Sequence, residues 1–150
     1  MANTIKEVFT KIYETNKWKS KETVSGFGSE IKRTESLRAE LITLFEMLKI
    51  KSILDIPCGD FNWMKEIDLS KFQYLGGDIV DKLVEDNQIK FKNMSFSKID
   101  ITNDVLPSCD IILVRDLFVH LSNNQIFKTI ENIKSSNCKY LLTTTFTNHI

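Results

Sequence analysis

Apolar residues recur at helical spacing in two stretches of the first fifty residues. In the first stretch, Thr4 precedes an apolar series, and Glu7 stands three residues after Thr4, the spacing of a capping box. The series consists of Ile5, Val8, Phe9, Ile12 and Tyr13. In the second stretch, residues 34–49, one apolar stripe is formed by Leu37, Leu41, Leu44, Phe45 and Leu48. The pattern predicts two amphipathic helices, joined by an aperiodic segment, residues 16–29, that we interpret as an ordered loop or a flap.

From residue 52 onward, short apolar runs alternate with segments of helical pattern. The runs predict strands at 52–57, 74–79, 95–101, 110–114 and 140–146, and the segments between them predict helices at about 62–67, from about 81 and from Ser122. Ser122 and Gln125 have capping-box spacing, and Ile126, Ile130 and Ile133 are expected to face the core. The alternation predicts an α/β fold, a Rossmann-like, doubly wound sheet of mainly parallel strands.

Composition narrows the class of protein without naming a function. The 150 residues suit one domain, and 20 basic residues balance 20 acidic ones, which argues against binding of nucleic acid or membranes by bulk charge. No apolar run approaches the ~20 residues that span a bilayer, and the first residues lack the layout of a signal peptide. Cys58, Cys109 and Cys138 form neither a disulfide framework nor a metal pattern, so we expect no metal and a cytoplasmic location.

Three features that suit a ligand follow three consecutive predicted strands. Gly59, in the turn after the first strand, allows close approach of a ligand to the backbone. Asp78, nineteen residues later, ends the second strand, where a carboxylate can accept hydrogen bonds from the two hydroxyls of a ribose. Asp100 and Ile101 end the third strand, where a carboxylate could bind the amine of an adenine. Each feature alone is common in turns, but their joint occurrence favours an adenosine-type ligand.

The turn itself discriminates between adenosine ligands. A dinucleotide site has several glycines that pack against a pyrophosphate, whereas residues 58–63 contain one glycine and the carboxylate of Asp60. Asp60 would repel a diphosphate but could hold an ammonium group. This disfavours NAD and suits a ligand with an amino-acid end, such as S-adenosylmethionine.

Residues 54–60, Leu-Asp-Ile-Pro-Cys-Gly-Asp, resemble motif I of the class I S-adenosylmethionine-dependent methyltransferases. Residues 74–79 resemble the acidic ribose-binding strand end of that family, residues 99–101 its adenine contact, and residues 115–121 the segment that faces the methyl group. More narrowly, Cys-Gly-Asp-Phe-Asn-Trp-Met at 58–64, Arg115-Asp116 with His120-Leu121, and Leu-Leu-Thr-Thr-Thr-Phe at 141–146 resemble a little-characterised bacterial branch. Its members often accompany surface-polysaccharide biosynthesis genes, which implies a sugar-like acceptor.

The resemblance covers roughly residues 18–150 and implies a single methyltransferase domain. We expect a helical N-terminal cap at 1–50 and a cofactor-binding core at 51–150. The expected cofactor-binding residues are Trp18, Arg38, Asp55, Pro57, Cys58, Gly59, Asp60, Asn62, Trp63, Asp78, Ile79, Asp100, Ile101 and Arg115. Pro57 and Phe61 stand where motif I commonly has further glycines, and the antiparallel edge strands of the family are missing. Either the chain is the N-terminal portion of a longer enzyme, which we favour, or its acceptor side is built differently.

Two side chains after the fourth strand are candidates for chemistry. If residues 115–120 are helical, Asp116 and His120 share a face. His120 could then accept the proton that a hydroxyl acceptor loses on methylation, with Asp116 orienting the acceptor. Alternatively, His120 packs between helices and Asp116 caps one.

Three residues near the expected ligand have two interpretations each. Trp18 either covers the ligand or anchors the first helix to the sheet, and Arg38 either pairs with the ligand carboxylate or is a solvated charge. Arg115 either binds an anionic group of the acceptor or is an ion-pair partner.

The sequence favours methyl transfer from S-adenosylmethionine to a small-molecule or sugar-like acceptor. Two other functions stay open: an NAD-dependent oxidoreductase and a module that binds S-adenosylmethionine without catalysis.

Overall fold

Residues 4–145 are described by the computed structural model, and their centre is a five-stranded parallel sheet in the order β3-β2-β1-β4-β5. The strands are β1 (Ser52–Asp55), β2 (Gln73–Asp78), β3 (Ser95–Lys98), β4 (Ile111–Val114) and β5 (Tyr140–Thr143). The α-helices are α1 (Ile5–Glu14), α2 (Glu35–Met47), α3 (Asp81–Lys90) and α4 (Asn123–Ser135), and short 3₁₀ turns lie at Phe27–Ser29, Met64–Glu66 and Phe118–His120. The predicted α/β fold with a parallel, doubly wound sheet is confirmed.

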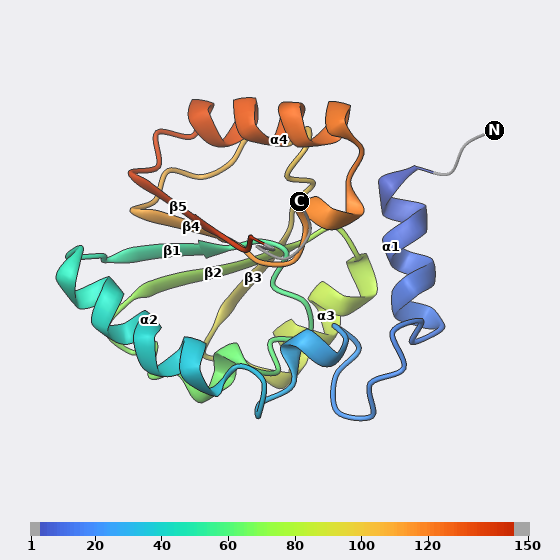
Figure 1. Cartoon of the computed structure of the whole chain (residues 1–150), viewed down its shortest axis with the longest axis horizontal. Helices are drawn as coiled ribbons and strands as arrows, with labels where there is room; N and C mark the ends of the chain where they lie inside the picture. Colours follow the sequence, from blue (N-terminus) through green and yellow to red (C-terminus); the bar gives the residue numbers. More distant parts are fainter. Residues whose placement is uncertain (1–3, 146–150) are drawn as a thin grey trace.

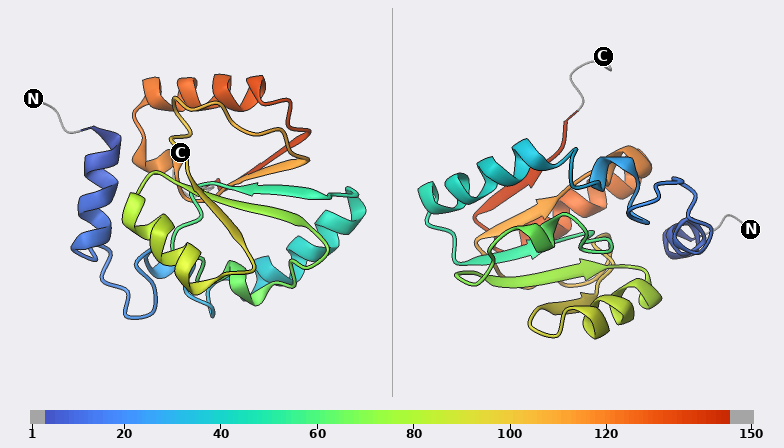
Figure 2. Two further views of the ribbon diagram at one scale, coloured as in Figure 1. Left: turned by 180° about the vertical axis from the view of Figure 1, so that it is seen from behind. Right: turned by 90° about the horizontal axis from the view of Figure 1, so that it is seen from below.

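Helices cover both faces of the sheet. In Figure 1, α4 lies above the strands, and α2 and α3 lie below them. Helix α1 covers neither face and lies beyond the carboxyl ends of the strands. Both views of Figure 2 show it set apart from the sheet. The N-terminal helix is therefore placed at the edge where parallel α/β sheets bind ligands.

The alternation of side chains along the strands builds two core layers. Ile53, Ile111 and Leu113 pack with Leu41 and Phe45 of α2 on one face. Their neighbours Leu54, Ile112 and Val114 pack with Ile133 of α4 on the other face. The fully apolar β4 has all four residues buried, because it lies inside the sheet with both faces covered.

The capping boxes at Thr4–Glu7 and Ser122–Gln125 are both formed, and they begin α1 and α4. One prediction for α4 is wrong: Ile130 is 37% exposed, and Thr129 is fully buried instead. Thr129 and Ile133 are four residues apart and lie on the same face as Ile126, whereas Ile130 falls beside that stripe. The predicted strands at 95–101 and 140–146 end earlier, at Lys98 and Thr143, and Phe146 lies outside the described residues.

Side chains rather than a shared backbone element hold α1 in place. The hydroxyl of Tyr13 donates to Asp86 Oδ2 on α3 at 2.7 Å, and Lys6 forms an ion pair with Asp81 at the start of α3. Ile12 is buried, and Phe9 packs against the core layer that includes Ile133. Within residues 4–145, no helix is long and apolar enough to cross a membrane.

Candidate functional site

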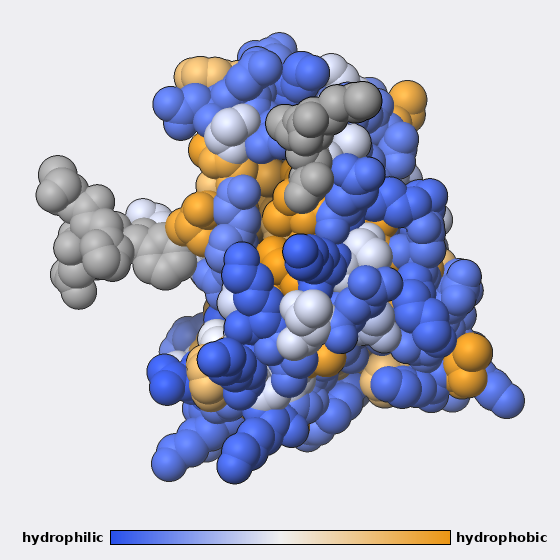
Figure 3. Space-filling model, turned by 90° about the vertical axis from the view of Figure 1, so that its right-hand side faces the viewer, coloured by the Kyte–Doolittle hydropathy of each residue, from blue (hydrophilic) through white to orange (hydrophobic). Residues whose placement is uncertain are grey.

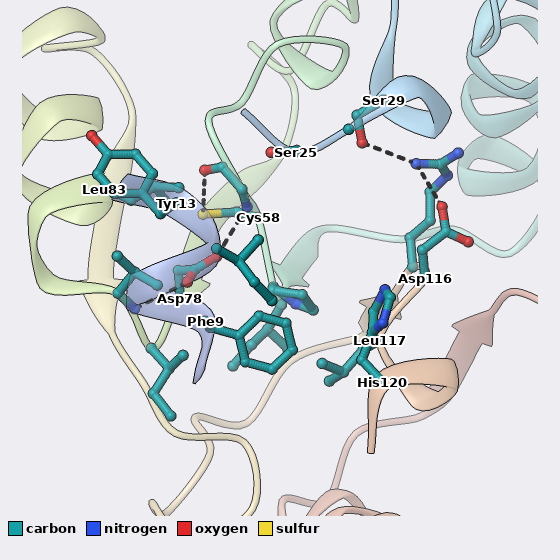
Figure 4. A pocket seen from close by; sticks show the side chains of 18 of the residues that line it. Phe9, Tyr13, Ser25, Ser29, Cys58, Asp78, Leu83, Asp116, Leu117 and His120 are labelled. Carbon is teal, nitrogen blue, oxygen red and sulfur yellow. Dashed lines mark hydrogen bonds and ion pairs between the residues drawn. The ribbon is translucent and has the colours of Figure 1, made fainter. Parts of the chain in front are cut away.

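A cavity of about 360 Å³ lies at the carboxyl edge of the sheet, beneath α1. It is lined by α1, by a segment that we call the covering loop (residues 18–30), by the turn after β1 (residues 56–60, the β1 turn), and by the residues that follow β2, β3 and β4. Figure 3 faces the side on which α1 lies, where hydrophobic side chains gather beneath α4 amid a mostly hydrophilic surface. In Figure 4, Cys58 and Asp78 lie toward one end of the cavity, and Asp116 and His120 toward the other.

The β1 turn requires a glycine at position 59. Gly59 has φ +56°, in the left-handed region, and a Cβ there would lie 2.2 Å from Ser25 Oγ. Its N–H donates to Asp78 Oδ2 at 3.1 Å, while the N–H of Cys58 donates to the carbonyl of Gly77 at 2.8 Å. The turn is therefore tied to the end of β2, with Ser25 of the covering loop directly above it.

Asp78 is a buried carboxylate at the end of β2 that lines the cavity. One oxygen accepts from the N–H of Gly59 and the other from the N–H of Val80 at 3.1 Å. Burial raises the pKa of Asp78 to about 6, although the backbone donors favour the charged form. Each carboxylate oxygen keeps a lone pair for a further donor, so the group can still bind hydroxyls from the cavity.

A second buried carboxyl, Asp55, lies at the end of β1. Tyr74 donates its hydroxyl to Asp55 Oδ2 at 2.7 Å. Burial, together with the charge of Asp78, raises the pKa of Asp55 to about 7, although the hydrogen bond from Tyr74 acts in the opposite direction. Burial also raises the pKa of the Cys58 thiol well above its ordinary value, which makes that side chain a packing group rather than a nucleophile.

Asp100 and Ile101 line the cavity in a turn beyond the end of β3. The carboxylate of Asp100 accepts from Thr102 N at 2.9 Å, Thr102 Oγ1 at 2.6 Å and Asn103 Nδ2 at 2.8 Å. Asp100 therefore stabilises its own turn, and Ile101 is buried in the core.

Two predicted cofactor residues of the β1 turn region face the covering loop rather than the cavity. Asp60 accepts from Thr23 Oγ1 at 2.7 Å, Val24 N at 3.1 Å and Ser25 Oγ at 2.9 Å. The amide nitrogen of Asn62 donates to Glu22 Oε1 at 2.6 Å and to the carbonyl of Ser29 at 3.2 Å. Neither residue lines the cavity, because both bind the loop that covers it.

Arg38 also lies outside the cavity. Its guanidinium donates to the carbonyl of Ile31 at 3.0 Å and to Thr34 Oγ1 at 3.4 Å. Arg38 thus binds the segment that leads into its own helix, α2.

Arg115, directly after β4, joins the covering loop to the sheet. It donates to the carbonyl of Gly28 at 2.7 Å and to Ser29 Oγ at 3.3 Å, and it pairs with Asp116 Oδ2 at 3.1 Å. The guanidinium also lies 5.5 Å from the centre of the Trp63 ring, a cation–π distance. Arg115 thus forms the predicted ion pair and also lines the cavity, so its predicted contact with an anionic group stays a prediction.

The condition that residues 115–120 are helical is met only in their second half. Asp116 has φ 53°, in the left-handed region, and only Phe118–His120 form a 3₁₀ turn, so Asp116 and His120 do not share a helix face. Both still line the cavity. The backbone departs from a helix at Asp116, whose N–H donates to Thr144 Oγ1 at 2.8 Å instead.

The His120 ring is flanked by two aromatic rings from the N-terminal part of the chain. Its centre lies 5.5 Å from that of Trp18, tilted by 33°, and 6.2 Å from that of Phe9, which meets it edge-on. Burial lowers the pKa of His120, although the charge of Asp116 acts in the opposite direction. At neutral pH the imidazole is therefore uncharged and able to accept a proton.

Sequence reasoning missed two groups of residues at the site. The first consists of Phe9, Ile12 and Tyr13 of α1, whose apolar stripe predicted a helix but not that this helix lines the cavity. The second is Asn87 on α3, which does not line the cavity but donates to the β1 turn; no local pattern distinguishes it from a surface residue. Ser25, which lies above Gly59, belongs to the segment that the sequence indicated as an ordered loop or a flap. In the described part of the chain, no cluster of His, Cys, Asp or Glu could hold a metal ion.

No family model matches the sequence, and no curated protein matches it either. Among solved structures, the chain is similar to the methyltransferase domain of bacterial CtHen1-C, with 14% identity, a TM-score of 0.63, and coverage of 73% of this chain and 64% of that one. It is also similar to magnesium protoporphyrin IX methyltransferase from Synechocystis, solved with bound S-adenosylmethionine, with 14% identity, a TM-score of 0.66, and coverage of 89% and 72%.

A further similar structure is the N-methyltransferase NodS from Bradyrhizobium japonicum in complex with S-adenosylhomocysteine, with 13% identity, a TM-score of 0.63, and coverage of 83% and 67%. The chain has the Rossmann-like fold of the S-adenosylmethionine-dependent methyltransferases. It spans less than two thirds of the CtHen1-C domain.

Proposed function

We propose that the cavity binds S-adenosylmethionine and that the chain takes part in methyl transfer from it to a small acceptor. The observation that carries the proposal is the pairing of Asp78 with Gly59. A buried carboxylate at the end of β2 lines the cavity directly beside a left-handed glycine turn at the end of β1. This is the arrangement that a Rossmann-like fold uses for the ribose and the neighbouring part of an adenosine ligand.

The cavity fits such a ligand better than it fits a dinucleotide. Its volume lies within the range of small-ligand sites, about 300–1,000 Å³. Ser25 Oγ closes the space above Gly59, and Asp60 lies next in the chain, so the β1 turn offers no open glycine loop for a pyrophosphate. Asp78 is positioned for the ribose hydroxyls, and the apolar side chains of Ile79 and Ile101 for the faces of an adenine ring.

S-adenosylmethionine, when bound, supplies a methyl group activated by a sulfonium. The residues of this chain bind, orient and shield it. Phe9 and Trp18 exclude water from the cavity beneath α1, and Arg115 holds the covering loop against the sheet. A ring nitrogen of His120 accepts the proton that a hydroxyl or amine acceptor loses, and the charge of Asp116 stabilises the resulting imidazolium.

The proposed acceptor is a small molecule with a hydroxyl or a similar nucleophile, and not a nucleic acid or a membrane surface. The balanced charge of the chain supports the exclusion of nucleic acid. A sugar-like group of a surface-polysaccharide precursor is one such acceptor, and it is supported by the sequence resemblance alone.

Isothermal titration calorimetry with S-adenosylhomocysteine tests the proposal. The wild-type chain should bind it, and Asp78→Ala should weaken binding about 10- to 100-fold, because two charge-assisted hydrogen bonds are lost. Asp78→Asn, which keeps the size of the side chain, serves if the alanine variant does not fold. Asp68→Ala, on an exposed Asp that bonds only to Ser70, is the matched control and should bind like the wild type.

Thermal-shift measurements distinguish the two cofactors. S-adenosylhomocysteine should raise the melting temperature, whereas NADH should not. A shift with NADH alone would favour an oxidoreductase, and binding without turnover of any acceptor would favour a binding module.

A further inference from the structure

The buried amide of Asn87 lies where helix α3 usually carries apolar side chains. Asn87 is 1% exposed, and its buried neighbours on the same helix are Leu83 and Val84. Asparagine is a poor helix former, and a buried amide without a hydrogen-bond partner destabilises the fold. The side chain must therefore be compensated by a specific acceptor.

That acceptor belongs to the β1 turn. The amide nitrogen of Asn87 donates to the carbonyl oxygen of Gly59 at 2.8 Å and lies 3.9 Å from Cys58 Sγ. Asn87 and Gly59 are separated by 28 positions in the chain, so their hydrogen bond joins α3 to the turn after β1.

The bond restrains one particular peptide unit, the one that connects Gly59 to Asp60. Its carbonyl accepts from Asn87, and its N–H, on Asp60, donates to Ser25 Oγ at 3.1 Å. The preceding peptide unit donates its N–H, on Gly59, to Asp78. Glycine at φ +56° has little intrinsic preference between backbone conformations, so these contacts decide how the two peptide units point.

We infer that Asn87 is a positioning residue for the β1 turn, which it holds in the orientation that receives the cofactor. The inference rests on the proposed function. Without the Asn87 bond, the peptide after Gly59 rotates among several orientations, and only a fraction of molecules presents the turn and Asp78 as the cavity requires. The apparent affinity for the cofactor is then the intrinsic affinity multiplied by that fraction.

A neighbouring residue provides a matched control. Gln88, next on α3, is also an amide, and its nitrogen donates to the carbonyl of Phe96 at 3.0 Å. It fastens α3 to β3 and does not touch the β1 turn. Asn87→Leu removes the hydrogen bond to Gly59 and the longer one to Cys58 Sγ, and Gln88→Leu removes the hydrogen bond to Phe96, so only the first variant releases Gly59.

The experiment compares the two variants by melting temperature and by calorimetry with S-adenosylhomocysteine. Both variants should melt at lower temperature than the wild type. Asn87→Leu should bind about ten-fold more weakly, while Gln88→Leu should bind like the wild type. If Asn87→Leu does not fold, Asn87→Ser replaces it, because a serine hydroxyl can bond to its own helix but is too short to reach Gly59.

A spectroscopic signature separates positioning from general destabilisation. The sequence has only five glycines, so their backbone amide resonances are readily resolved by NMR. The Gly59 resonance should move in Asn87→Leu and stay in place in Gln88→Leu. Equal weakening of binding in both variants, or an unchanged affinity and Gly59 resonance in Asn87→Leu, would overturn the inference. Absence of binding by the wild type would instead overturn the proposed function, and the movement of the Gly59 resonance would still decide whether Asn87 orients the turn.

Discussion

Arg115, at the end of β4, donates a 2.7 Å hydrogen bond to the carbonyl oxygen of Gly28, which lies 87 positions earlier in the chain. The same guanidinium pairs with Asp116 and lies over Trp63. One planar cation thus joins the covering loop, the sheet edge and the aromatic lining of the cavity. A lysine has a single nitrogen and no planar face, so it cannot make these contacts together.

We expect Arg115→Lys to loosen the covering loop while the sheet stays intact. Amide hydrogen exchange at residues 26–30 should accelerate, and the free energy of unfolding should fall by about 1–2 kcal/mol. Arg33→Lys, on an exposed arginine whose ion pair with Glu30 is 3.9 Å long, should change neither quantity. Unchanged exchange in Arg115→Lys would show that Asp60 and Asn62 hold the loop without it.

His120 should control the acidic limb of the rate profile if it accepts the proton of the acceptor. Burial lowers its pKa, so the rate should rise with pH through a point below the ordinary histidine pKa and then level off. His120→Gln should lower kcat about 10²- to 10⁴-fold and abolish that limb. Its affinity for S-adenosylhomocysteine should be retained, because the change lies at the other end of the cavity from Asp78. An unaltered limb in the variant would exclude His120 as the base.

Asp55 should make the protein less stable as the pH rises from about 4 to about 7. Its pKa is about 7 in the folded chain and has the ordinary value of 3.8 when exposed, so within this window the folded state binds more protons than the unfolded state. The stabilising contribution is fully present below pH 4 and is lost as the pH rises through 7. Asp55→Asn is neutral throughout and can still accept the hydroxyl of Tyr74.

Urea unfolding at several pH values checks this expectation. The variant should gain stability relative to the wild type as the pH rises across the window, by a few kcal/mol in total. A difference that is constant from pH 4 to pH 8 would contradict a raised pKa for Asp55.

Tyr13 should hold α1 closed over the cavity through its bond to Asp86. Burial, helped by that bond, raises the pKa of Tyr13 to about 12, so the hydroxyl remains a donor throughout the physiological range. Tyr13→Phe should lower the free energy that holds α1 against the rest of the chain by about 1 kcal/mol. Trypsin should then cleave after Lys17, Lys19 or Lys21 several-fold faster. Tyr140→Phe, on an exposed tyrosine of β5, is the control. Equal cleavage rates in the wild type and Tyr13→Phe would show that apolar packing alone holds the helix.

Local patterns were sufficient to predict most of the fold. The strand β4 was predictable because burial on both faces requires consecutive apolar residues. The capping boxes of α1 and α4 were predictable because they involve two residues only three positions apart. The helical turn that would have placed Asp116 and His120 on one face is not formed at Asp116, because the side chain of Thr144, directly after β5, binds its N–H and supports a left-handed backbone.

The candidate site was less predictable than the fold. The clustering of Gly59, Asp78 and Asp100 at strand ends follows from sheet geometry and was visible in the sequence. The directions of Asp60 and Asn62 were not, because their partners are 33 to 40 residues earlier, in a loop without periodicity. The role of Asn87 was not predictable either, because its acceptor is a distant backbone carbonyl, a group that every residue has.

The strand order places β1 between β2 and β4, and this divides the cavity into two sides that can change independently of each other. Under the proposed function, Asp78 and the residues after β3 retain the cofactor on one side of the Gly59 turn, while residues 115–121 meet the acceptor on the other. Exchange of residues 118–121, which keeps Arg115 and its bonds to the covering loop, can redirect the chain to a new acceptor and leave cofactor affinity unaltered. Such a scaffold can diversify its chemistry one loop at a time.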